Sequence, residues 1–177
     1  TCLPWISGCT SKYIFRSNDF GVTWVQASTI ASQHVTLSID DSGQYQATAD
    51  YQNYGGRINY SSDYGVTWTT IYPGGSFWSA VGISGDGTHM TGMTDSGSTF
   101  YISSNSGATW SSVTVSSLNL NRVVLSQTGQ YQMALQTRGG SLYISSNYGV
   151  DWTDVSSVQS PSVISISSSG QYQIAAK

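Results

Sequence analysis

The acidic side chains are the first candidates for chemistry, because a pair of carboxylates is the usual machinery of glycoside hydrolysis. All nine acidic residues of this 177-residue chain are aspartates. Three of them share no spacing that would bring two together: Asp50, Asp151 and Asp154. The other six lie in segments with the composition of turns: Asp19, Asp40, Asp41, Asp63, Asp86 and Asp95. We therefore predict no catalytic carboxylate pair and no enzymatic activity.

The remaining reactive side chains form no recognisable site either. His34 and His89 fall in different expected strands, where a packed side chain is the simpler interpretation. Serine is abundant, but the sequence has no Gly-x-Ser-x-Gly segment, no glycine-rich phosphate loop and no cluster with metal-ligand spacing. We predict no cofactor and no metal, although calcium at the turn aspartates stays open.

Composition narrows the class of protein further. Only 8% of the residues are charged, the net charge is −3, and the six basic residues are scattered, which argues against nucleic-acid binding. Aromatic residues make up 12% of the chain, too many for a disordered segment. No apolar run is long enough to span a membrane. A surface of neutral hydroxyls and amides is typical of secreted β-proteins, so we expect an extracellular or cell-surface location.

One octapeptide, Ser-x-Asp/Asn-x-Gly-x-Thr/Asp-Trp, occurs four times, and its tryptophans lie 44, 42 and 42 residues apart. Its acidic or amide side chain can accept hydrogen bonds from backbone N–H groups of the same turn, and its glycine can supply a positive φ. The tryptophan can pack beneath the turn. We predict structural roles for Asp19, Gly21, Trp24, Asp63, Gly65, Trp68, Asn105, Gly107, Trp110, Asn147, Gly149 and Trp152.

A second glycine motif keeps step with the first. Gly43, Gly87, Gly129 and Gly170 each follow an alternating apolar run, as expected for a strand that enters a hairpin. In one repeat we predict four strands, at Phe77–Ser84, His89–Thr94, Thr99–Ser103 and Thr109–Val113. Four short antiparallel strands in about 42 residues are typical of a β-propeller blade. The sequence therefore predicts an all-β fold with almost no helix.

The four octapeptides resemble the Asp-box, or BNR, repeat of sialidases, sortilin-type receptors and related β-propellers. This resemblance covers the whole chain and implies that each box joins the third and fourth strands of a blade, at the periphery and away from an active centre. Sialidases resemble one another in an arginine triad, a Tyr/Glu nucleophile pair and an acid/base Asp. This sequence has no Glu, and its four arginines do not follow that pattern. The resemblance therefore implies the fold of a sialidase without its activity.

The terminal segments are predicted to share one blade. The chain opens with third and fourth strands and ends with first and second strands, Ser162–Ser167 and Gln171–Ala176. We predict that the two pairs form a composite closing blade of a four-bladed ring. The repeats would then lie near 11–28 plus 162–177, 34–72, 77–115 and 120–156.

Residues 1–10 are treated as a separate N-terminal segment, in which Cys2 and Cys9 are predicted to form a local disulfide. This segment also aligns with a second strand, so two segments compete for one place in the closing blade. The C-terminal strands could therefore complete a neighbouring molecule instead, or the chain could be part of a larger propeller.

Binding is predicted at the loops that differ among the repeats. Tyr51, Tyr54 and Arg57 form the richest of these loops, able to stack on a sugar ring or to anchor a protein. Asn59 begins the single N-glycosylation sequon. We expect a non-catalytic extracellular recognition module that binds glycan or protein through its blade loops. The alternative is a structural subunit that assembles with other copies of itself into a fibre or coat by strand exchange, and a remote alternative is a fragment of a larger sialidase-like propeller.

Overall fold

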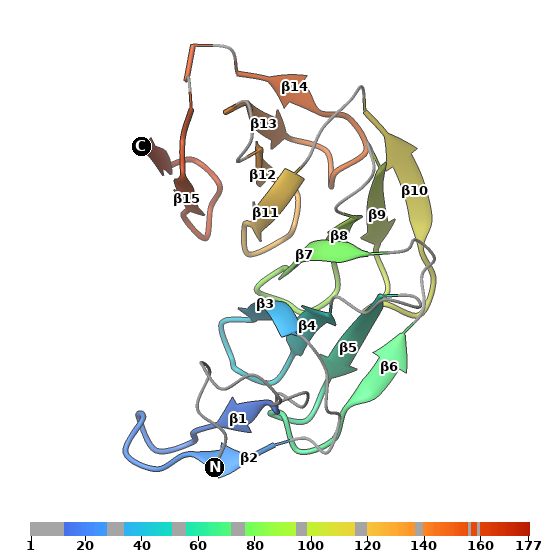
Figure 1. The fold of residues 1–177 in the computed structure, drawn as a ribbon, viewed down its shortest axis with the longest axis vertical. Helices are drawn as coiled ribbons and strands as arrows, with labels where there is room; N and C mark the ends of the chain where they lie inside the picture. Colours follow the sequence, from blue (N-terminus) through green and yellow to red (C-terminus); the bar gives the residue numbers. More distant parts are fainter. Residues whose placement is uncertain are drawn as a thin grey trace, which may run out of the picture.

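The computed structural model describes residues 13–27, 34–50, 56–71, 77–94, 99–115, 120–136, 140–155, 157–158 and 160–177. Every regular element among these residues is a β-strand (Figure 1). The prediction of an all-β fold is confirmed.

Three four-stranded antiparallel sheets form complete blades, and in each the strands pair in chain order. Blade 1 contains β3 (His34–Ile39), β4 (Gln46–Asp50), β5 (Arg57–Ser61) and β6 (Thr69–Ile71). Blade 2 contains β7 (Trp78–Ile83), β8 (Met90–Thr94), β9 (Thr99–Ser103) and β10 (Ser111–Thr114). Blade 3 contains β11 (Leu120–Leu125), β12 (Gln132–Gln136), β13 (Leu142–Ser145) and β14 (Thr153–Asp154). The strands predicted for blade 2 begin and end within two residues of those observed.

The first hairpin of each blade follows one local plan. It turns on a glycine in the left-handed region, with φ of 76° at Gly43, 73° at Gly87 and 75° at Gly129. This conformation is costly for any residue with a side chain. The pairing register also shifts once near the start of each innermost strand, between His34 and Thr36, Trp78 and Ala80, and Leu120 and Arg122. Such bulges increase the local twist of a strand.

The blades stack face to face through apolar side chains. The cluster between blades 1 and 2 consists of Ala47, Ala49, Ile58, Trp78 and Val81. The cluster between blades 2 and 3 consists of Ala80, Met93, Phe100, Leu120, Val123 and Ala134. The box tryptophan of one blade also reaches the blade before it, since Trp152 stacks on Phe100 with ring centres 4.1 Å apart and planes 5° apart.

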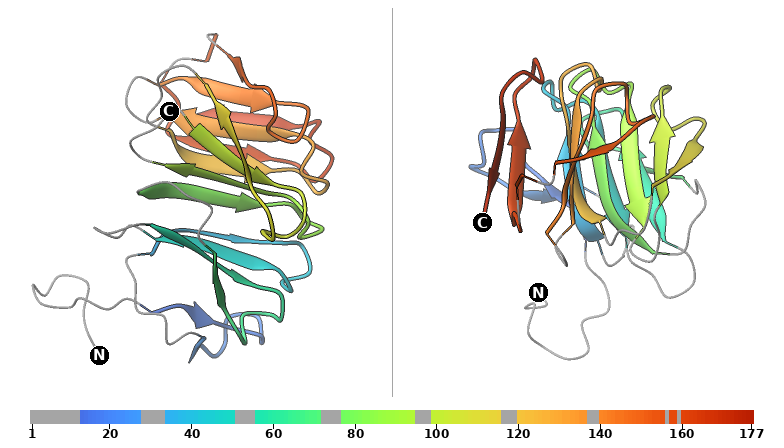
Figure 2. Two further views of the ribbon diagram at one scale, coloured as in Figure 1. Left: turned by 90° about the vertical axis from the view of Figure 1, so that its right-hand side faces the viewer. Right: turned by 90° about the horizontal axis from the view of Figure 1, so that it is seen from above.

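The blades follow an open arc. In Figure 1, β3, β7, β11 and β15 lie on the inner side and β6, β10 and β14 on the outer side. The two further views show the sheets stacked one on the next (Figure 2). Residues of the four inner strands line a central cavity of about 390 Å³. These strands therefore surround the axis of the propeller on one side.

The closing blade is where the structure departs from the prediction. The N-terminal hairpin, β1 (Phe15–Arg16) and β2 (Val25–Gln26), and the C-terminal hairpin, β15 (Val163–Ile166) and β16 (Gln173–Ala176), form separate two-stranded sheets. They lie at opposite ends of the arc (Figure 1). The prediction of a composite blade within one chain is therefore wrong for this structure.

Candidate functional site

The octapeptides form the same hydrogen-bonded turn in each hairpin that they close. In the second copy, the Thr67 backbone N–H donates to Asp63 Oδ1 at 2.8 Å, and the Ser61 hydroxyl donates to the same oxygen at 2.8 Å. The Gly65 N–H donates to Ser61 Oγ at 2.9 Å. The Trp68 indole N–H donates to the Gly65 carbonyl at 3.1 Å. Equivalent bonds recur around Asp19, Asn105 and Asn147.

The two boxes that contain asparagine keep the same turn, but the direction of one side-chain hydrogen bond is reversed. In the aspartate boxes a threonine hydroxyl donates to the carboxylate. In the third box Asn105 Nδ2 donates to Thr109 Oγ1 at 2.8 Å, and in the fourth Asn147 Nδ2 donates to Asp151 Oδ2 at 2.7 Å. The change of threonine to Asp151 is thus matched by an amide donor, and two carboxylates do not face each other in this turn.

The turn favours the ionised form of its aspartate. Hydrogen bonds from the Thr67 side chain and then from its backbone N–H lower the pKa of Asp63 from 3.8 to about 2. Bonds from Thr23 likewise lower the pKa of Asp19 to about 2. A carboxyl whose pKa is lowered by folding stabilises the fold above its ordinary pKa, and this contribution is lost as the pH falls toward the lowered value. The relevant window is therefore about pH 4 to pH 2.

Replacing Asp63 with asparagine is expected to remove part of the acid sensitivity without unfolding the blade, because Asn105 already makes the same turn with an amide. Urea unfolding at pH 6, 4, 3 and 2 measures this effect. The difference in midpoint between pH 4 and pH 2 should be smaller in Asp63→Asn than in the wild-type chain. Equal acid sensitivity in the two proteins would show that the Asp63 carboxylate does not contribute.

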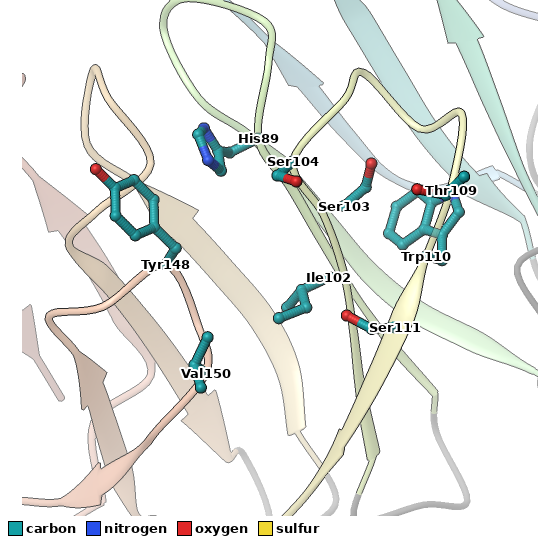
Figure 3. Close-up of a pocket in the computed structure, with 9 residues that line it drawn as sticks. All are labelled: His89, Ile102, Ser103, Ser104, Thr109, Trp110, Ser111, Tyr148 and Val150. Atoms are coloured by element: carbon teal, nitrogen blue, oxygen red, sulfur yellow. The ribbon is translucent and has the colours of Figure 1, made fainter.

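A groove lies on the outer part of the boundary between blades 2 and 3. It has a volume of about 330 Å³. Figure 3 shows Tyr148 and Val150, from the fourth box, on one side, and Ile102 and Ser104, from β9 and its turn, on the other. The full lining is His89, Ile102, Ser103, Ser104, Thr109, Trp110, Ser111, Tyr148 and Val150. We refer to this site as the blade 2/3 groove.

The groove exists because two residues at this boundary differ from their equivalents at the boundary between blades 1 and 2. At the boundary between blades 1 and 2, the residue before the box serine is Tyr60, and its hydroxyl forms a hydrogen bond with Ser106 of the next blade. Burial raises the pKa of Tyr60, as expected for a filled boundary. At the boundary between blades 2 and 3, Ile102 takes the place of Tyr60 and Tyr148 takes the place of Ser106. The shorter side chain leaves space that the tyrosine lines.

Tyr148 is held in an unusual backbone conformation. Its φ is 63°, and the equivalent residues of the other boxes, Phe20, Tyr64 and Ser106, also have positive φ. The Tyr148 N–H donates to the Gln130 carbonyl at 3.0 Å, which ties the turn to its own blade. The ring then stacks on His89 of blade 2 with centres 4.7 Å apart and planes 28° apart. The two rings form an aromatic platform at one end of the groove.

The hydrogen bonds around His89 determine which of its ring nitrogens carries the proton in the neutral form. Burial opposes ionisation of Asp86, but hydrogen bonds from Ser84 and Thr88 and the charge of His89 outweigh it and lower the pKa of this carboxyl. An ionised Asp86 only accepts, so the Thr88 hydroxyl donates to Asp86 Oδ1 at 2.7 Å. His89 Nδ1, 2.9 Å from that hydroxyl, must then donate to it. Neutral His89 therefore carries its proton on Nδ1 and has an acceptor at Nε2.

Of the three residues expected to bind ligand, only Arg57 lies among the described residues, and it does not line the groove. Tyr51 and Tyr54 lie outside the described residues, as do Cys2 and Cys9. Arg57 lies on β5, where its backbone N–H donates to Asp50 Oδ1 at 2.8 Å. The third box supplies Trp110 to the groove, the fourth supplies Tyr148, and the turn before β8 supplies His89; none of the three was predicted as a binding residue. The sequence feature that could have pointed to this site is His89, which stands where the other repeats have tyrosine.

The structure argues against glycosylation at Asn59. This residue is completely buried in β5. Its Nδ2 donates to Asp50 Oδ2 at 3.3 Å, and its Oδ1 accepts from the Thr70 hydroxyl at 2.9 Å. A glycan on this nitrogen would have no space in the folded blade.

Among the residues that the structure describes, no three His, Cys, Asp or Glu side chains gather closely enough to hold a metal ion. No helix in the same part of the chain has the length and apolar character needed to cross a membrane.

Comparison with known proteins places the fold. The model of the BNR-Asp box repeat matches residues 14–27. An ancestral GH74 enzyme superimposes on 94% of this chain with a TM-score of 0.69 at 17% sequence identity. The chain has the fold of a BNR-Asp box β-propeller. A GH74 enzyme from Niastella koreensis matches 72% of it with a TM-score of 0.58 at 23% identity. YCF48 bound to a D1 peptide matches 81% with a TM-score of 0.59 at 14% identity.

This propeller chain is short beside its structural neighbours. It covers 25% of the ancestral GH74 chain, 18% of the Niastella koreensis chain and 48% of the YCF48 chain. At these identities the likeness concerns the fold. No curated protein sequence matches the chain.

Proposed function

We propose that this propeller chain is a non-catalytic recognition module that binds neutral saccharides in the blade 2/3 groove. The observation that carries the proposal is the chemistry of the lining. Among the described residues that line the groove, none has a carboxylate, an ammonium or a guanidinium group. Its walls consist of aromatic and aliphatic side chains edged by hydroxyls. A volume of about 330 Å³ lies within the range of roughly 300–1,000 Å³ that is usual for small-molecule sites.

This lining fits an uncharged, hydroxyl-rich ligand. The Tyr148 ring provides an apolar surface on which the C–H face of a sugar can stack, and its hydroxyl can form a hydrogen bond. His89 Nε2 can accept a hydrogen bond from a sugar hydroxyl. Ser104, Thr109 and Ser111 can donate or accept around the rim. An acidic or basic peptide would find no opposite charge among these side chains, which favours saccharide over protein as the ligand.

The arrangement of the carboxylates supports binding rather than hydrolysis. Glycoside hydrolysis uses two carboxyl groups that flank one bond, about 5–10 Å apart. Asp86, the carboxylate nearest His89 in sequence, accepts hydrogen bonds from Ser84 and Thr88. Asp63 and Asp19 are engaged in their own turns. The GH74 neighbours are named as enzymes and YCF48 as bound to a peptide, so both binding and catalysis occur on this fold, and the site decides between them.

An extracellular or cell-surface location agrees with this proposal. Only 8% of the residues are charged. Exposed glycans are the ligands that a neutral groove of this kind would meet there.

The test is binding of the 177-residue chain to an array of neutral and acidic oligosaccharides, followed by titration of cellohexaose and maltohexaose with trigalacturonic acid as the acidic comparison. Tyr148→Ala should weaken binding of a neutral saccharide at least about tenfold, or roughly 1.4 kcal/mol. The matched control is Tyr64→Ala, because Tyr64 holds the same position in the second box and lies outside the groove. Its affinity should stay within about twofold of wild type.

A third variant closes the groove without removing any of its polar groups. Ile102→Tyr restores the tyrosine that fills the boundary between blades 1 and 2, and it should abolish binding while the circular dichroism spectrum is unchanged. The proposal fails if no neutral saccharide binds. It also fails if Tyr64→Ala reduces affinity as much as Tyr148→Ala does.

A further inference from the structure

The two terminal hairpins are complementary halves of one blade. By alignment with the complete blades, β15 and β16 correspond to first and second strands, and β1 and β2 to third and fourth strands. Among the described residues each hairpin is a sheet of only two strands. In this described part of the chain, one edge of β16 and one edge of β1 therefore lack the pairing that β4 and β5 make in blade 1. Such edges are sites for strand addition.

The first complete blade carries an apolar face that its equivalents bury. Leu37 and Ile39 on β3 are 67% and 60% exposed. The residues at the same positions of blade 2, Val81 and Ile83, are 2% and 5% exposed because blade 1 covers them. The face of β3 is thus built to be covered by first and second strands of a preceding blade.

The C-terminal hairpin carries the matching face. Ile174 on β16 occupies the position of Ala47 on β4. Ala47 is completely buried in the cluster that contains Val81 of the following blade. Ile174 is 66% exposed. Its partner at a completed boundary would be the face of β3 that carries Leu37 and Ile39.

A contact between an aromatic residue and a glycine recurs at each blade boundary, and it also matches the C-terminal hairpin with blade 1. At each boundary, the aromatic residue before the second strand of one blade packs on the turn glycine of the next. The three observed pairs are Tyr45 with Gly87, His89 with Gly129, and Tyr131 with Gly170. Tyr172 and Gly43 are the unmatched members of a fourth pair. Tyr172 is 71% exposed, and a methyl group on Gly43 would meet only the Ile39 Cδ1 atom, 3.8 Å away.

We propose that two copies of this chain close into one ring, in which the C-terminal hairpin of each copy pairs with the N-terminal hairpin of the other. Each copy supplies three complete blades and one half of each of two shared blades. Two copies then give eight blades, within the usual range of about four to eight. One copy alone would give four, but its hairpins lie at opposite ends of the arc (Figure 1).

The pairing in blade 1 fixes the expected register. Gln46 pairs with Ser61 and Thr48 with Asn59 across β4 and β5. The equivalent pairs place Gln173 opposite Ser17 and Ala175 opposite Phe15 of the other copy. Cβ atoms of such directly opposed residues lie about 4.5–5.5 Å apart, within reach of a short thiol crosslinker.

The experiment mixes two single-cysteine chains. Light scattering on a sizing column should first give about twice the 19.0 kDa of one chain. Phe15→Cys and Ala175→Cys chains, mixed and treated with a short bismaleimide, should then yield a covalent dimer. The wild-type chain sets the background from Cys2 and Cys9, and each variant must elute as wild type does.

The control for register replaces Ser112, an exposed residue of the outer strand β10, with cysteine in place of Ala175. This mixture should give no covalent dimer above background. A second variant, Ile174→Asp, should shift the light-scattering mass to that of one chain and leave the circular dichroism spectrum unchanged. A monomeric wild-type chain overturns the proposal. Closure within one copy does so too, and is recognised when the Phe15→Cys/Ala175→Cys double variant crosslinks internally and the mixture does not crosslink.

Discussion

Replacing Trp78 with alanine is expected to lower the free energy of unfolding by about 3–5 kcal/mol, the usual cost of truncating a large buried aromatic side chain. Trp78 is completely buried at the boundary between blades 1 and 2. Its ring centre lies 5.0 Å from that of Tyr101 and 6.5 Å from that of Trp110. Those two rings belong to blade 2, whereas Ala47, Ala49 and Ile58 of blade 1 pack in the same cluster as Trp78, so the loss would leave a cavity at the boundary between the blades.

Two glycines show how closely the structure is fitted to this ring. A methyl group on Gly92 would come 2.5 Å from Trp78 Cζ3, and one on Gly56 would come 2.5 Å from Trp78 Cδ1. These residues lie on neighbouring blades, so neither blade can move inward to fill the space without backbone rearrangement. A site that cannot collapse is at the costly end of large-to-small substitutions.

Urea or guanidinium unfolding measures the effect, with two comparison variants. Trp78→Phe should cost less than half as much, because it keeps an aromatic ring and removes an indole N–H that is buried with no hydrogen-bond partner in the described part of the chain. Tyr148→Ala, which removes an exposed aromatic side chain, should cost about 1 kcal/mol or less. A loss below about 1 kcal/mol in Trp78→Ala would mean that the blades do not pack through this residue.

Replacing Gly87 with alanine is expected to lower the free energy of unfolding by about 2–5 kcal/mol. Two effects add. The φ of 73° costs an L-residue about 1–2 kcal/mol. The new methyl group would also overlap the ring of Tyr45 on blade 1, and overpacking of this kind costs about 1–3 kcal/mol.

A double-mutant cycle separates the two effects. Removing the ring in Tyr45→Ala should relieve the overlap, so Gly87→Ala in that background should cost only the backbone term of about 1–2 kcal/mol. Chemical unfolding of the four proteins gives the coupling energy. If Gly87→Ala costs the same with and without Tyr45, the turn of blade 2 does not pack against blade 1 as described.

The repeat made most of the fold predictable. Each blade is a local unit, and its turns are signalled by residues that act within a few positions, such as Asp63 with Thr67 and Trp68 with Gly65. Alternating apolar residues located the innermost strands for the same reason. Four copies in register then fixed the architecture without any information on long-range contacts.

Neither the groove nor the way in which the ring closes could be predicted from the repeat. The groove depends on Ile102 and Tyr148, which belong to different blades and meet only across a boundary. A comparison of repeats detects each change but does not indicate that the two are neighbours. Closure of the ring depends on the rotation between neighbouring blades, which is the sum of small packing effects at each boundary. The strand pattern in the sequence does not help, because it is the same whether a hairpin pairs within its own chain or with another chain.

The most direct test of the recognition site is a nuclear magnetic resonance titration of ¹⁵N-labelled protein with the neutral hexasaccharide that binds best on the array. The Trp110 indole lines the groove and the Trp68 indole does not, although both make the same bond within their boxes. The proposed function predicts saturable shifts of the Trp110 indole N–H and the Tyr148 amide, with the Trp68 indole N–H unmoved. Binding that moves Trp68 and leaves Trp110 and Tyr148 unchanged, or the absence of any saturable shift, would contradict it.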